Sequence, residues 1–137
     1  YGKPVPVIGD TLRFTHVTNR AIAFSIGRGL ADPLLFVLAT VVPLLVLALL
    51  ALYFLFGRDL SRAQRWVLAA ILGGGLGNHV DRIFRGGAVV DFADFKFYGI
   101  FGLERWPVFN VADSTVVVGG IILLVSFLAT GVRGPKS

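Results

Sequence analysis

The stretch PLLFVLATVVPLLVLALLALYFLF, from Pro33 to Phe56, contains 24 residues and no charged side chain. At about 1.5 Å per residue, a helix of this length crosses the hydrocarbon core of a bilayer, which is roughly 30 Å thick. Pro43 lies inside the run, and membrane helices tolerate proline. The run therefore predicts a membrane-spanning helix.

Two later segments extend this pattern. The apolar part of the next one, Trp66 to Leu76, is too short to cross a bilayer alone, so a span there carries the polar residues after it to the membrane edge or inside it. We expect an all-α polytopic membrane protein with a small extracytoplasmic β-cradle and an interfacial helix. The three expected transmembrane helices are 33–57, 62–84 and 110–131.

The composition places the chain in the membrane class. Of its 137 residues, 55% are hydrophobic, and the mean hydropathy is +0.80. The net charge of +5 comes from scattered lysines and arginines, so we expect no nucleic-acid partner. The absence of cysteine excludes disulfides, thiolate nucleophiles and Cys-ligated zinc. Because the sequence contains no methionine, we expect that Tyr1 is not a translation start.

Basic residues predict the orientation. Arg58, Arg62 and Arg65 crowd the loop after the first span, and Arg133 and Lys136 follow the third. By the positive-inside rule, both segments are cytoplasmic. The segments 1–32 and 85–109 then lie on the outer face, as a β-rich cradle and a catalytic or interfacial segment of one membrane-embedded domain, 1–137.

The outer segments show local signals of their own. In the first, Val5 to Ile8, the turn Gly9-Asp10 and the alternation Leu12, Phe14, His16 predict two short strands. In the second, aromatic residues from Phe95 to Trp106 suit the headgroup layer of a membrane.

Four aspartates lie beside or between the apolar segments, where carboxylates are costly and usually functional. Asp91 and Asp94, in VVDFADF, suit a surface loop, a cation site or half of a catalytic site. Asp113, in FNVADS, also suits the first turn of a helix capped by Asn110. Asp81, in GGGLGNHVDR, can be neutralised by a nearby arginine.

The same GGGLGNHVDR segment contains Gly73 and Gly77, whose spacing predicts close approach of another helix. The alternative for the segment is a packing helix with a polar end in water. Neither histidine belongs to an HExxH pattern, so His79 is interpreted as a polar residue at a helix end and His16 as structural.

Aspartyl proteolysis needs two carboxylates that share one proton, one acting as general base on a water and the other as acid.

The motifs GNHVDR, GGAVVDF and FNVADS, together with THVTNRAIAFSI upstream, occur in an order and spacing that closely resemble the bacterial lipoprotein signal peptidases (signal peptidase II). The resemblance covers the chain from about Leu12 to Gly131. The family has four membrane helices, so the chain is expected to lack the first.

The resemblance implies roles for seven residues. Asp91 and Asp113 correspond to the catalytic pair. The residues that correspond to substrate-binding or supporting positions are Asn19, Asn78, Asp81, Arg82 and Asn110.

The resemblance also implies the reaction. The substrate is a prolipoprotein whose cysteine carries a diacylglyceryl group, and cleavage just before that cysteine releases the signal peptide. No metal or organic cofactor is expected. We expect a monomer in contact with membrane lipid, located in the bacterial cytoplasmic (inner) membrane with its active site toward the extracytoplasmic face.

Two other interpretations stay open. The acids can line the path of a small ion or proton transporter, in which case they are spread along a pore. They can also be structural acids of a non-catalytic membrane scaffold, in which case Asp91 and Asp113 need not be near each other. The arrangement of these two side chains distinguishes the three interpretations.

Overall fold

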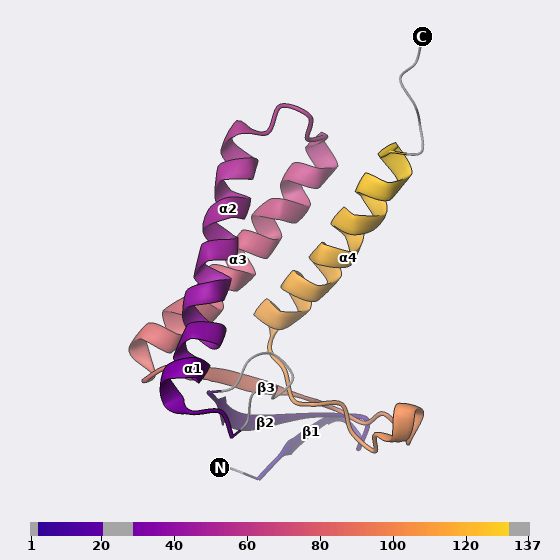
Figure 1. The fold of residues 1–137 in the computed structure, drawn as a ribbon. Coiled ribbons are helices and arrows are strands. Elements are labelled where there is room, and N and C mark those ends of the chain that lie inside the picture. The colour runs from indigo at the N-terminus through magenta and orange to yellow at the C-terminus, as the bar shows by residue number, and fades with distance from the viewer. Residues whose placement is uncertain (1–2, 21–28, 132–137) are drawn as a thin grey trace.

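The computed structural model describes residues 3–20 and 29–131. It contains an antiparallel sheet at one end of a group of long helices (Figure 1). The strands are β1 (Val5–Ile8), β2 (Leu12–Asn19) and β3 (Val89–Phe95), and the helices are α1 (Asp32–Phe36), α2 (Val42–Phe56), α3 (Arg62–Phe84) and α4 (Val111–Gly131).

The apolar run from residue 33 onward forms one helical rod made of α1, a π-helical turn at Val37–Val41, and α2. The π-helical turn ends two residues before Pro43, which has no N–H to offer the carbonyl of Ala39 four residues earlier. The rod ends where Arg65 of α3 donates hydrogen bonds to the carbonyls of Phe54 and Gly57. The orphan carbonyls at a helix end are thus satisfied by a side chain from the next helix.

Helix α3 begins at a capping box, in which Ser61 and Gln64 each bond the backbone N–H of the other. The amide of Gln64 also donates to Ser126 Oγ of α4 at 2.9 Å. Leu68, which is fully buried, packs with Leu123 in the core between these helices. One polar bond and one apolar cluster therefore join α3 to α4 far from the sheet.

Glycines allow the helices to approach each other. A Cβ on Gly74 would collide with Thr115 and Ala112 of α4, and a Cβ on Gly119 of α4 would lie 2.6 Å from Ile71 Cγ1. The predicted contact through Gly73 and Gly77 is wrong, because a Cβ at either position meets no described atom within 4 Å.

The sheet has the order β1-β2-β3, with both pairs antiparallel. The two strands predicted in the N-terminal segment are confirmed as β1 and β2. The predicted interfacial helix is not confirmed. Between α3 and α4 the structure has β3 and a single 3-10 turn at Ile100–Gly102.

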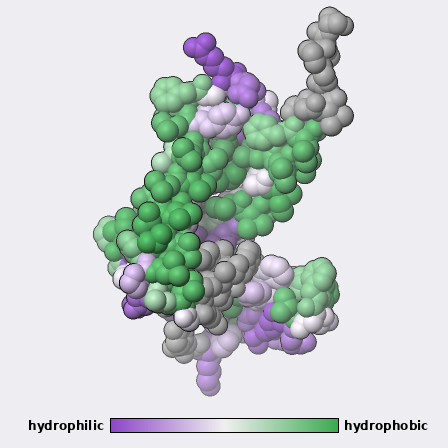
Figure 2. All heavy atoms as spheres, viewed as in Figure 1, coloured by the Kyte–Doolittle hydropathy of each residue, from purple (hydrophilic) through white to green (hydrophobic). Residues whose placement is uncertain are grey.

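Two helical segments, Asp32–Phe56 and Val111–Ala129, are long and apolar enough to cross a membrane by length and composition. Helix α3 is not a third such segment within the described residues. Its bounds nevertheless agree with the expected 62–84. On the face that Figure 2 shows, hydrophobic residues cover the helices, and hydrophilic residues gather at the loop between α2 and α3 and at the end of the molecule that carries the sheet. Arg133 and Lys136, used for the orientation, lie outside the described residues.

The contact at Gly119 can be tested with a matched pair of variants. We expect Gly119→Ala to destabilise the protein by about 1–3 kcal/mol, because the new methyl group must displace Ile71 or push the helices apart. Gly120→Ala, in the same helix but with no described atom within 4 Å of the added Cβ, is the control. Thermal unfolding in detergent measures both. Equal melting temperatures for the two variants would contradict the close packing of α3 on α4.

Candidate active site

The site lies where the sheet meets the helices, and four chain segments supply it. The polar end of α3, strand β3 and the first turn of α4 carry the motifs GNHVDR, VVDF and FNVADS. The antiparallel pairing of β2 with β3 adds the end of β2, where Asn19 is paired with Val89. Residues separated by up to about a hundred positions in the sequence thus reach one place in the fold.

Asn110 connects the two aspartates of the predicted pair. Its side-chain Nδ2 donates to Asp91 Oδ1 at 2.9 Å, and its backbone N–H donates to Asp113 Oδ2 at 3.1 Å. Asn78 extends the network, because its Nδ2 donates to Asp113 Oδ1 at 2.9 Å and its Oδ1 accepts from Asn110. The fold therefore gathers Asp91 and Asp113 around one asparagine.

The bond between Asn110 and Asp113 is reciprocal. Asn110 Oδ1 accepts a hydrogen bond from the backbone N–H of Asp113, while Asp113 accepts one from the backbone N–H of Asn110. This arrangement satisfies donors that the start of α4 would otherwise leave without partners. The predicted helix start is confirmed, and the cap also fixes the carboxyl of Asp113 at the rigid end of a helix.

Asp91 is the most enclosed acid of the site, with 2% of its surface exposed. Besides the bond from Asn110, it accepts a hydrogen bond at 3.0 Å from the amide of Asn19. Burial raises the pKa of the Asp91 carboxyl above its ordinary value. The negative charge of Asp113 adds to the rise, while the two amide hydrogen bonds and the charge of Arg82 oppose it.

Asp81 and Arg82 hold the backbone around the site. Asp81 accepts from the backbone N–H of Val90, next to Asp91, and pairs with Arg85 at 3.0 Å. Arg82 donates to the carbonyl of Gly87 at 2.8 Å. The end of α3 is thereby tied to the start of β3, and the expected neutralisation of Asp81 by an arginine is confirmed.

Asp94 belongs to a different cluster. Arg13 of β2 and Arg105 donate to its two carboxyl oxygens, and both arginines also contact Asp10. Although burial opposes it, the hydrogen bonds from Arg105 and Arg13 lower the pKa of Asp94 below its ordinary value. Of the three interpretations of VVDFADF, none anticipates this ion-pair cluster. Arg13 is the one arginine or lysine in β2, where apolar and polar residues alternate. This isolated charge is the signal that could have indicated an ion pair with an aspartate of the next strand.

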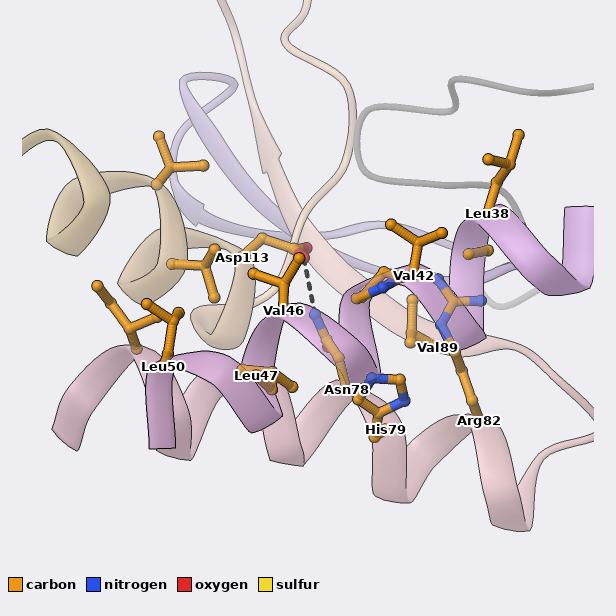
Figure 3. Close-up of a pocket in the computed structure, with 16 residues that line it drawn as sticks. Leu38, Val42, Val46, Leu47, Leu50, Asn78, His79, Arg82, Val89 and Asp113 are labelled. Atoms are coloured by element: carbon orange, nitrogen blue, oxygen red, sulfur yellow. Dashed lines mark hydrogen bonds between the residues drawn. The ribbon is translucent and has the colours of Figure 1, made fainter. Parts of the chain in front are cut away.

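A cavity of about 440 Å³ opens beside Asp113, between the first helical rod, α3 and α4. Its wall is mostly aliphatic, with Val42, Val46 and Leu47 among the lining residues (Figure 3). Asn78, His79, Arg82 and Asp113 form its polar part. The site thus presents a carboxylate at the edge of a space suited to hydrocarbon.

The comparisons with known proteins agree with this geometry. The family model described as Signal peptidase (SPase) II matches residues 1–129. The lipoprotein signal peptidase of Treponema denticola is 46% identical over 132 residues, which are 96% of this chain and 76% of the relative. That of Treponema pallidum is 43% identical and covers 90% of this chain and 67% of the relative.

A solved structure described as a bacterial membrane enzyme superposes with a TM-score of 0.80 at 26% identity, covering 99% of this chain and 77% of that one. The family model, the relatives and the solved structure thus each match nearly the whole chain. The chain belongs to the signal peptidase II family of aspartic peptidases.

Proposed function

We propose that this protein is an intramembrane aspartyl endopeptidase that removes the signal peptide from diacylglyceryl-modified prolipoproteins, cleaving before the lipidated cysteine. The observation that carries the proposal is the single residue, Asn110, that holds both Asp91 and Asp113. Membership of the signal peptidase II family supports it, as do relatives named lipoprotein signal peptidase.

Asp91 and Asp113 are proposed as the catalytic pair. Asp91 holds the shared proton, because burial raises its pKa and the charge of Asp113 opposes a second negative charge nearby. Asp113 then takes a proton from water as the water attacks the scissile carbonyl, and Asp91 protonates the carbonyl oxygen. When the tetrahedral intermediate collapses, the proton on Asp113 passes to the leaving amine, and a hydroxyl of the intermediate returns a proton to Asp91.

The other predicted residues are proposed as supports. Asn19, Asn78 and Asn110 orient the two carboxylates by donating to them. Asp81 and Arg82 fix the backbone that leads into β3. A preorganised network of this kind spares the reaction the cost of reorienting donors as charge develops.

The cavity suits the lipidated part of the substrate. Its aliphatic wall matches acyl chains, and its polar end lies at Asp113. A substrate anchored in the membrane reaches such a space by lateral movement. We propose that α3 spans the membrane together with the two apolar segments, in the bacterial cytoplasmic membrane, with the sheet on the extracytoplasmic side and the loop at Arg58 inside. The protein acts as a monomer.

The two competing interpretations receive no such support. A transporter predicts acids spread along a path, whereas Asn110 gathers the two aspartates into one network. A scaffold does not need a second carboxylate beside the helix cap of Asp113. Neither interpretation is favoured by the comparisons.

The catalytic pair can be tested by single substitutions. We expect Asp91→Asn and Asp113→Asn each to reduce cleavage of a lipid-modified precursor by at least about a thousandfold, because the reaction needs both the acid and the base. Asp59→Asn, in the exposed loop between α2 and α3, is the control and should keep most of the activity because Asp59 bonds Tyr53 at the end of the helices far from the network. Turnover is measured in detergent with folded protein. Full activity of either pair variant would refute the assignment.

Asp91 is also expected to destabilise the protein at neutral pH. A raised folded-state pKa means that the folded protein holds the proton more tightly than the unfolded chain, so stability is lost as the pH rises through that pKa. Asp91→Asn removes this loss. Its melting temperature should exceed that of the wild type at pH 8, and the difference should shrink as the pH falls toward about 4, the ordinary carboxyl range. A constant difference across this interval would contradict the raised pKa.

A further inference from the structure

His79 is a buried polar residue to which the mechanism above gives no role. Only 7% of its surface is exposed, and it lies in the wall of the cavity, between Asn78 and Arg82 in the chain (Figure 3). Its Nε2 is shielded from solvent and has no hydrogen-bond partner among the described residues. Such an atom in a native protein calls for a partner that the structure does not contain, because leaving a buried donor or acceptor unpaired is costly.

The neighbouring polar groups already have partners. Asn78 uses its amide nitrogen on Asp113 and its oxygen on Asn110. Both oxygens of Asp113 accept hydrogen bonds from these asparagines. Arg82 Nη1 donates to backbone carbonyls of Gly87 and Arg20. Among the solvent-shielded side-chain atoms of this wall, His79 Nε2 is therefore the one without a partner within the described ranges.

The rest of the cavity indicates what the partner is. Leu38, Ala39 and Val42, from the π-helical turn and the start of α2, line the same space as His79 and offer no polar side chain. A ligand there is mostly hydrocarbon with a few polar atoms. A diacylglyceryl group has this character, and its ester oxygens only accept hydrogen bonds, so they need a donor. Rotation of the imidazole about χ2, which is a broad torsion, can turn Nε2–H toward such an oxygen.

We propose that His79 is a substrate-binding residue whose Nε2–H donates a hydrogen bond to an ester carbonyl of the substrate's diacylglyceryl group. This inference rests on the proposed function and deepens it, because it assigns the lipid to one side chain of the cavity. His79 takes no part in the proton transfers of Asp91 and Asp113. Its contribution is to substrate binding and to discrimination between ester-linked and other lipids.

The test compares two synthetic lipopeptides with the same peptide and the same chain lengths, one with ester-linked and one with ether-linked chains. The ether lacks the carbonyl oxygen. The enzymes are the wild type, His79→Phe, which keeps a ring without a donor, and His79→Gln, which keeps an N–H donor. The values of kcat and KM are measured in detergent micelles for each pair of enzyme and substrate.

We expect His79→Phe to raise KM for the ester by about five- to tenfold with kcat nearly unchanged, since one hydrogen bond is lost. His79→Gln should recover most of this loss. For the ether, all three enzymes should have similar KM values. A merely structural role for His79 would change both substrates equally.

Three results would overturn the proposal, and they differ from failure of the proposed function. They are an unchanged KM for the ester with His79→Phe, an equal loss on both substrates, or a wild type that binds ester and ether alike. Since the last comparison uses only the wild type, it is valid even if the variants do not fold. If the folded wild type cleaves neither lipopeptide, the proposed function itself fails.

Discussion

The hydrogen bonds of Asn110 are the constraint on which the rest of the site depends. Two carboxylates placed beside hydrocarbon need donors, because an unpaired buried charge is unstable and either takes up a proton or displaces the structure around it. Asn110 supplies a side-chain donor to Asp91 and a backbone donor to Asp113. Because it also caps α4, any shift of that helix moves both bonds. The stability of the helix start and the alignment of the acids are thus one property.

Strand β3 is fixed from both ends, which explains how a short sheet holds a precise site. At one end Asp81 and Arg82 bind the backbone at Val90 and Gly87. At the other end Asp94 is bound by Arg13 and Arg105. A three-stranded sheet alone is only marginally stable. The charged groups at its two ends therefore complement the hydrophobic contacts of the helices.

The sequence predicted the helices well and the sheet only in part. Charge-free runs and the Asn110 cap set the bounds of the first and third helices, and both depend on local physics. Leu12, Phe14 and His16 correctly indicated β2, yet Phe14 and His16 are exposed while Asn19, from the other set, is buried. The face of β2 that carries Arg13 and Asn19 is buried because these two side chains donate hydrogen bonds to Asp94 and Asp91 of β3. Such partners, distant in sequence, are invisible to a local pattern.

The absence of a side chain at Gly74 has a consequence for attempts to stabilise the protein by mutation. Replacing glycine by alanine within a helix is a common way to make a protein more stable. At this position the substitution would force α3 away from Thr115 and Ala112, the residues flanking the turn that carries Asp113. Since Asn78 lies one turn along α3 from Gly74, the displacement would reach the bond to Asp113. A stabilising substitution at this contact between α3 and α4 would therefore disturb the alignment of the active-site residues. Substitutions intended to stabilise the protein should be placed at the opposite end of the helices.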